Sequence, residues 1–202
     1  MKIISLPNLA DNCLLYLKAE YVALYRQKGI KKAYNEFDYL RIGYIISTYF
    51  RGQSCNVLDV GTGPGVLLNW MNLQPNITAV GIDNKEYSTY YDFSGASNRI
   101  IMNAAKMNFS DNSFDLVFCL EVLEHLNDRT MLDVIREMKR VSRGKVIISV
   151  PFEEPEPRPK YHIQRFTENK IKELVASANL SLLCKEGQHY PIALIDIDCQ
   201  SE

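Results

Sequence analysis

The residues of this chain with the clearest chemical potential lie in the segment VLDVGTGPG, from Val57 to Gly65. Its apolar run contains one carboxylate, Asp59. Three glycines with the spacing G-x-G-x-G follow, at Gly61, Gly63 and Gly65. A glycine-rich turn after a buried strand lets the backbone approach a ligand, and the third glycine lets the next helix begin close to it. The segment therefore predicts a nucleotide-type binding site at the end of a buried strand.

Charge separates the nucleotides that could bind at this turn. Asp83 ends the apolar run ITAVGID, where its carboxylate could accept both hydroxyls of a ribose. Dinucleotide-binding turns use the spacing G-x-G-x-x-G, and no Lys or Arg occurs between Gly52 and Asp83 to meet a pyrophosphate. S-adenosylmethionine (SAM) has no phosphate and carries a sulfonium and an ammonium, both attracted to carboxylates. The pattern favours SAM over NAD, and a strand–helix turn that binds no ligand is the alternative.

Alternating strands and helices must position these residues. The sequence predicts strands at 56–61, 77–83, 98–103, 114–120 and 145–151, and two closing strands at 180–187 and 192–198. It predicts helices at 65–73 and 129–141, and another that is capped by Thr167 and runs to about Ala178. Continuously apolar strands that alternate with helices are typical of an α/β fold with a parallel sheet covered on both faces.

The N-terminal part of the chain has a different pattern. Residues 8–50 are rich in Leu, Tyr and Lys at helical spacing, with one helix expected over 31–49. We interpret residues 1–50 as an N-terminal helical cap of the same domain and residues 51–202 as its core. The many tyrosines are compatible with ordinary packing or with a cover over a compact substrate.

Composition restricts the class of protein. The 202 residues are 47% hydrophobic and 23% charged with a net charge of -1, which is typical of a globular protein and gives no general attraction to nucleic acid or anionic membranes. The five cysteines form no C-x-x-C pair, and we find no signal-like N-terminus and no apolar run long enough to span a membrane. We expect free thiols and a cytoplasmic location.

Several segments resemble the class I SAM-dependent methyltransferases, and within them the type-11 group. VLDVGTGPG is similar to the family's motif I and AVGID to its second motif, while the run from Met102 to Leu126 is similar to its third and fourth motifs. The resemblance covers roughly residues 57–180. It implies a Rossmann-like seven-stranded sheet, mostly parallel with the last strand antiparallel, and SAM as the methyl donor with S-adenosylhomocysteine as the product.

The resemblance also implies roles for individual residues. Around the methionine part of SAM it would place Asp59, Gly61, Gly63 and Gly65. Asp83 would hold the ribose, and Asn103 with Ala104 would meet the adenine. Asn103 stands where the family usually has Asp, but its amide oxygen can still accept from the adenine amino group. Cys119 and Glu121, at the end of the fourth core strand, would lie beside the transferred methyl.

Methyl transfer from a sulfonium needs mainly proximity and orientation, and a base only if the acceptor arrives protonated. His125 is the candidate base because histidine titrates near neutral pH, although it could instead orient a loop. His162 and Arg165 follow the proline-rich stretch PFEEPEPRPK on the side where substrates enter. We expect them to contact the acceptor or, failing that, to belong to a surface loop anchored by Phe166.

A second interpretation concerns metal-assisted catalysis. The spacing E-x-x-E-H with a later His resembles the metal site of small-RNA 3′-terminal 2′-O-methyltransferases and would use Glu121, Glu124, His125 and His162. A divalent ion there would polarise ribose hydroxyls. The run EVLEHL also occurs in type-11 enzymes that need no metal, so the main prediction includes none.

A group of basic residues bears on whether the methyl acceptor is a nucleic acid. Five basic residues could bind phosphate or could simply favour a helix C-terminus: Arg136, Lys139, Arg140, Arg143 and Lys145. The main prediction is methyl transfer to a small-molecule oxygen or nitrogen acceptor, without nucleic acid or membrane as a partner. The RNA enzyme and a non-catalytic SAM-binding partner subunit are the alternatives, and no oligomeric state follows from these residues.

Overall fold

In the computed structural model, residues 1–6, 36–86 and 98–200 are described, and they contain one eight-stranded sheet. The strands lie in the order β1-β7-β8-β6-β5-β2-β3-β4. Their bounds are β1 (Lys2–Ser5), β2 (Cys55–Val60), β3 (Ile77–Asp83), β4 (Arg99–Ile101), β5 (Phe114–Leu120), β6 (Ser142–Pro151), β7 (Asn179–Cys184) and β8 (Ile192–Asp198). Only β8 runs antiparallel to its neighbours within this sheet, as predicted for the last strand.

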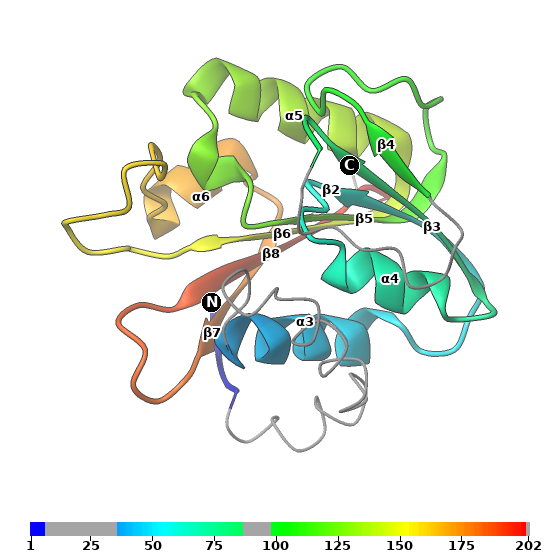
Figure 1. Cartoon of the computed structure of the whole chain (residues 1–202). Helices are drawn as coiled ribbons and strands as arrows, with labels where there is room; N and C mark the ends of the chain where they lie inside the picture. The colour runs from blue at the N-terminus through cyan, green and yellow to red at the C-terminus, as the bar shows by residue number, and fades with distance from the viewer. Residues whose placement is uncertain (7–35, 87–97, 201–202) are drawn as a thin grey trace.

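Helices cover both faces of the sheet (Figure 1). On one face lie α3 (Glu36–Tyr49) and α4 (Val66–Asn72), and on the other α5 (Asp128–Val141) and α6 (Glu168–Leu174). Side chains of β5 alternate between the two layers: Phe118 packs in the core beneath α3 and α4, while Val117 and Cys119 pack in the core beneath α5 and α6. Burial on both faces explains why these strands are apolar throughout.

The sheet has one strand more than the seven predicted. Residues 2–5, expected within a helical cap, form β1 and pair in parallel with β7. Ile4 and Leu6 are buried in the core on the α3 side, which stabilises this added edge strand.

Helix α3 also belongs to the layered fold, because its Ile45 and Ile46 are fully buried in the same core. The remaining residues of the predicted cap, 7–35, lie outside the described residues.

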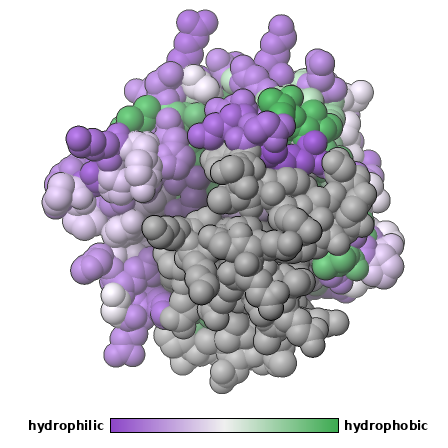
Figure 2. All heavy atoms as spheres, viewed as in Figure 1, coloured by the Kyte–Doolittle hydropathy of each residue, from purple (hydrophilic) through white to green (hydrophobic). Residues whose placement is uncertain are grey.

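The other predicted elements are present, and β3, β5 and β8 have the expected bounds, whereas β6 begins three residues earlier than predicted and β7 ends three residues earlier. Thr167 caps α6 as predicted, with its side chain accepting from the Lys170 N–H, but α6 ends at Leu174 instead of near Ala178. Within the described residues, no helix combines the length and apolarity needed to cross a bilayer. Figure 2 shows a largely hydrophilic described surface on this side of the molecule, with small separate hydrophobic patches.

Candidate active site

A cavity of about 710 Å³ opens at the carboxyl ends of β2, β3 and β5. Ligands bind at this edge in open α/β sheets because loops and helix ends converge there. The predicted site residues that line the cavity are Gly61, Asp83, Asn103, Ala104, Glu121 and His125. Residues remote in the sequence are thus brought to one cavity, as the predicted topology requires.

The glycine turn between β2 and α4 has a backbone that requires glycine. Gly61, Gly63 and Gly65 all have positive φ, of 73°, 51° and 81°. A Cβ atom on Gly61 would overlap Cγ2 of Val122, which comes from the turn after β5. The Gly63 N–H donates to Oδ2 of Asp83 over 2.9 Å, which joins the turn to the end of β3. Gly61 lines the cavity, while Gly63 and Gly65 are buried beside it.

Asp59 lies beneath this turn as a buried carboxylate. Thr62 Oγ1 donates to Asp59 Oδ2 over 2.6 Å. Burial raises the pKa of Asp59 to about 6, with the charge of Asp83 adding to the rise and the Thr62 hydrogen bond opposing it. Neither carboxylate forms an ion pair with another described residue.

This charge pattern suits a cationic ligand. Two neighbouring carboxylates attract an ammonium or sulfonium and repel a phosphate. Among the described residues that line the cavity, Lys85 is the only lysine or arginine. It lies two residues after Asp83, which ends the segment without Lys or Arg. The glycine turn and its carboxylates therefore fit SAM.

For the residues predicted to meet the adenine, the structure qualifies one expectation. Asn103 is exposed and lines the cavity beside Ala104. Its Oδ1 accepts from the Ala105 N–H over 2.9 Å, so the oxygen assigned to the adenine amino group already serves a local turn. A second lone pair remains on that oxygen.

Cys119 and Glu121, both predicted to lie beside the transferred methyl, have different environments. Cys119 is fully buried beneath α5 and does not line the cavity, and burial raises the pKa of its thiol well above the usual range. Glu121 lines the cavity with φ of 56°. The guanidinium of Arg41 lies 2.7 Å from its Oε1, and the Ser149 hydroxyl donates to the same atom over 2.8 Å.

Arg41 comes from α3 and is 3% exposed, so this helix reaches the cavity edge through an ion pair between a buried arginine and a partly exposed glutamate. Sequence reasoning missed this residue, because nothing near Arg41 in the chain marks it as a partner of Glu121. Only the packing of α3 against the sheet brings the two together.

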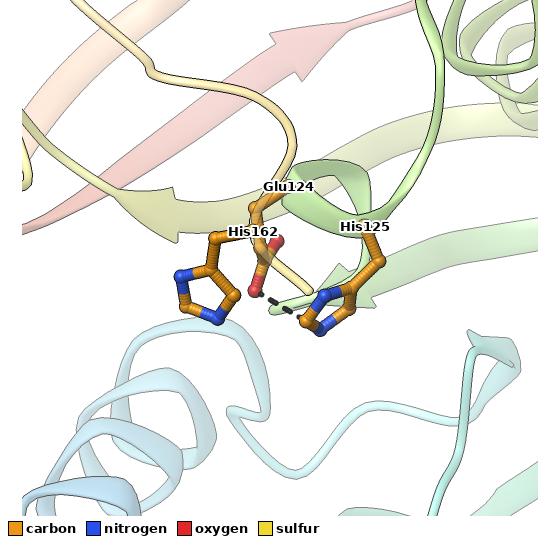
Figure 3. Close-up of side chains that lie close together, drawn as sticks. All are labelled: Glu124, His125 and His162. Carbon is orange, nitrogen blue, oxygen red and sulfur yellow. Dashed lines mark ion pairs between the residues drawn. The ribbon is translucent and has the colours of Figure 1, made fainter. Parts of the chain in front are cut away.

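Two predicted histidines and a glutamate meet beside the cavity, and of these three residues His125 lines it while Glu124 and His162 do not. His125 and Glu124 belong to the short 3-10 helix η2 (Leu123–His125), and His162 comes from the loop after β6. Figure 3 shows the Glu124 carboxylate between the two imidazole rings. One potential ligand atom from each residue lies within 4.8 Å of the others.

Backbone hydrogen bonds hold the loop against η2. The N–H groups of Ile163 and Gln164 donate to the carbonyl of Glu124, over 2.9 and 3.1 Å. The side chain of Gln164 donates to the carbonyl of Leu126 over 2.7 Å. These hydrogen bonds therefore fix the position of the loop that carries His162 relative to η2.

Each imidazole has a partner on Nδ1. His125 Nδ1 lies 3.0 Å from the carbonyl oxygen of Tyr161, and His162 Nδ1 lies 2.8 Å from Oε2 of Glu154. Since both partners accept, Nδ1 carries the proton in each neutral ring and Nε2 carries the lone pair.

The carboxylates behind the histidines are buried. Glu154 is 3% exposed and Glu124 is 1% exposed. Burial, followed by the charges of Glu121 and Glu154, raises the pKa of Glu124 well above its ordinary value. Sequence reasoning missed Glu154, whose only signal was its place in the proline-rich loop eight residues before His162.

Arg165 has a structural contact: its Nε donates to the backbone carbonyl of Glu154 over 3.4 Å, and it does not line the cavity. The part of the cavity near η2, α5 and the loop after β6 is largely apolar, which we did not predict from the sequence. Its lining residues are Val122, Leu126, Thr130, Val134, Tyr161 and Ile163. Tyr161 and Ile163 are 65% and 54% exposed, unusually open for large apolar side chains.

Ion pairs engage four residues of the basic cluster. Its contacts are Arg136 with Asp133, Arg140 with Glu137 and Asp111, Arg143 with Asp115, and Lys145 with Asp196. These acids offset the positive charge that a phosphate would need, so the pairs do not favour the phosphate interpretation.

Comparison with known proteins agrees with this geometry. A type-11 methyltransferase domain family matches residues 58–149. Ubiquinone biosynthesis O-methyltransferase of Rickettsia bellii is 31% identical over 121 residues, which are 54% of this chain and 49% of that protein. The chain therefore spans about half the length of the curated relatives it matches.

Solved structures share the fold at low identity. One is the 1,6-didemethyltoxoflavin-N1-methyltransferase of Burkholderia thailandensis, solved with 1,6-didemethyltoxoflavin and S-adenosylhomocysteine; its TM-score is 0.67 at 16% identity, over 91% of this chain and 87% of that one. Another is the [4+2]-cyclase SpnF, with a TM-score of 0.59 at 14% identity, over 78% of this chain and 79% of that one. The fold alone does not decide the reaction.

Proposed function

We propose that this chain, which belongs to the type-11 group of the class I SAM-dependent methyltransferases, transfers a methyl group to a small molecule through an oxygen or nitrogen nucleophile. The observation that carries the proposal is one cavity lined by Gly61 and Asp83 at the glycine turn and, at another wall, by the imidazole of His125, with the His162 ring adjacent to it. The turn suits a cationic nucleoside, and the wall suits an acceptor that must lose a proton.

The cofactor end uses the glycine turn. Asp83 has one oxygen engaged by the Gly63 N–H and a second available for the ribose hydroxyls. Asp59 supplies negative charge beneath the turn, and Asn103 and Ala104 border the adenine. When bound, SAM supplies an electrophilic methyl on a sulfonium, and the protein holds the nucleophile in line with it. In this proposal Gly61, which lines the cavity, lies alongside the ligand.

The acceptor end uses the apolar wall from η2, α5 and the loop after β6. Its mixture of aliphatic and aromatic side chains favours a compact, partly apolar molecule. The two proteins named above as O- and N-methyltransferases support a small-molecule acceptor by analogy. Glu121, held by Arg41, borders the place where the two ligands meet.

His125 accepts the acceptor's proton in this proposal. Its Nδ1 is held by the Tyr161 carbonyl, so the Nε2 lone pair is available to a hydroxyl or ammonium. His162 contacts the acceptor from the facing loop and is oriented by Glu154.

Four described cysteines, Cys55, Cys119, Cys184 and Cys199, are free thiols. Free thiols are usual where glutathione keeps proteins reduced, and they support our expectation of a cytoplasmic location.

The test is transfer of a labelled methyl from SAM into cell extract separated into small-molecule, RNA and protein fractions. We expect label in the small-molecule fraction, with S-adenosylhomocysteine as competitive inhibitor. The control is His189→Ala, which changes the one histidine outside the cluster and should leave transfer unchanged.

Two outcomes would replace the proposal. Label in RNA that disappears on chelation would favour the metal-dependent 2′-O-methyltransferase, for which the grouping of Glu124, His125 and His162 is the supporting observation. Tight S-adenosylhomocysteine binding without label in any fraction would favour a non-catalytic partner subunit.

A further inference from the structure

We infer that Glu124, His125 and His162 form a binding site for one divalent transition-metal ion beside the cavity, which His125 lines. The site is defined by one carboxylate oxygen and two imidazole nitrogens within 4.8 Å of one another (Figure 3). Two imidazoles with one carboxylate form a donor set that suits Zn²⁺, Fe²⁺, Co²⁺ or Mn²⁺, and it differs from the oxygen sets that Ca²⁺ and Mg²⁺ prefer.

Hydrogen-bond partners on Nδ1 orient both histidines as metal ligands. Nδ1 of His125 faces a backbone carbonyl and Nδ1 of His162 faces the buried Glu154 carboxylate. Each Nε2 is left with its lone pair, and His125 Nε2 lies 3.7 Å from Oε1 of Glu124. Histidines that bind metals almost always donate their other N–H to a carboxylate or carbonyl in this way.

Charge gives an independent argument for a cation. Glu124 is 1% exposed, and its Oε2 accepts no hydrogen bond from the described residues. A buried carboxyl oxygen without a partner is unfavourable unless a cation or donor occupies the adjacent space. Glu121 and Glu154 add negative charge nearby, and the buried cation in the group, Arg41, is in contact with Glu121.

Glu121 itself is outside the proposed ligand set. Its Oε1 is engaged by both Arg41 and Ser149, in contrast to Glu124. A three-ligand site keeps open coordination positions on the metal, as catalytic sites do. Because His125 lines the cavity, those positions would face the acceptor.

The class of acceptor follows from these open coordination positions on the metal. This step rests on the proposed function. A transition-metal ion binds and polarises an oxygen of the acceptor, so the site favours a hydroxyl acceptor over an amine. The metal would then take over from His125 the task of lowering the hydroxyl pKa.

Metal titration of the full chain tests the site directly. After chelation and desalting, the protein is titrated calorimetrically with Mn²⁺, Co²⁺ and Zn²⁺, and the visible absorption of Co²⁺ reports nitrogen and oxygen ligation. We expect one equivalent to bind. Binding should be lost in Glu124→Gln and His162→Ala, retained in His189→Ala, and weakened ~10–100-fold in Glu154→Gln, which acts only through His162.

The inference is overturned if the wild type binds none of the three ions, or if Glu124→Gln and His162→Ala bind them as the wild type does. Thermal unfolding of each metal-free variant shows whether a loss reflects unfolding, and Glu124→Gln, which keeps the side-chain shape, is expected to stay folded. S-adenosylhomocysteine binding and methyl transfer are measured on the same samples. Methyl transfer without metal binding contradicts only the metal site, and metal binding without transfer contradicts only the proposed function.

Discussion

The two walls of the cavity are built in different ways. The proposed cofactor wall, from the ends of β2 and β3, consists of backbone and the Asp83 carboxylate, with Asp59 buried beneath it, all within one short stretch of chain. The proposed acceptor wall joins η2 to a loop almost forty residues later through hydrogen bonds to the backbone of Glu124. The first depends on backbone conformation at the glycine turn and on its close packing, and the second on hydrogen bonds between distant segments, so mutations should affect them in different ways.

The largest expected effect is on the acceptor wall alone. His125→Ala should lower kcat by ~10²–10⁴-fold, the range of general acid–base catalysis, and leave S-adenosylhomocysteine affinity unchanged. Steady-state kinetics with calorimetric binding measures both quantities. Equal losses in turnover and cofactor affinity would show that the two walls are not separable.

The next effect is on the cofactor wall. Gly61→Ala should lower the free energy of unfolding by ~2–5 kcal/mol, the sum of backbone strain at positive φ and overpacking against Val122. The control is Gly187→Ala, with φ of 78° and no atom near the added Cβ, which should cost only the strain, about 1–2 kcal/mol.

Chemical denaturation gives both values for this glycine pair. Similar losses in the two variants would contradict the close approach of Val122 to the glycine turn. S-adenosylhomocysteine binding should fall in Gly61→Ala and remain unchanged in Gly187→Ala.

Asp59 predicts a pH dependence of stability. Its pKa is raised by burial from 3.8 to about 6 in the folded protein, so the folded state holds the proton more tightly than the unfolded chain. This contribution to stability is present below pH 4 and is lost as the pH rises to 6, by about 3 kcal/mol.

Asp59→Asn should remove that slope, and the variant should be more stable than the wild type above pH 6. Its S-adenosylhomocysteine affinity should nevertheless fall, because the charge beneath the turn is gone. Denaturation at pH 4, 5, 6 and 7 measures the difference, and parallel curves for the two proteins would contradict the buried charge.

The smallest expected effect is on ribose recognition. Asp83→Ala should weaken S-adenosylhomocysteine binding about tenfold or more, because a buried hydroxyl pair loses a charged acceptor. It also removes the hydrogen bond from the Gly63 N–H, which Asp83→Asn would keep through its amide oxygen. Calorimetry of both variants separates ribose binding from support of the turn, and wild-type affinity in Asp83→Ala would contradict the position of the cofactor.

The amino-acid sequence by itself determined the layered α/β core. Apolar runs set β3, β5 and β8, because strands buried on both faces tolerate few polar residues. The glycine turn and its acidic partners were also readable, since a positive φ and a tight turn require particular residues at fixed spacing. Thr167 marked its helix start for a similar local reason.

Only the tertiary structure decided the added strand β1, which is stable because Ile4 and Leu6 find a core and β7 offers an open edge. It also decided that Cys119 faces the core while Glu121 faces the cavity, and that Arg41 pairs with Glu121. The tertiary structure likewise decided that Glu154 pairs with His162. These contacts join residues far apart in the chain, and no local pattern encodes which of many possible partners the packed fold will bring together.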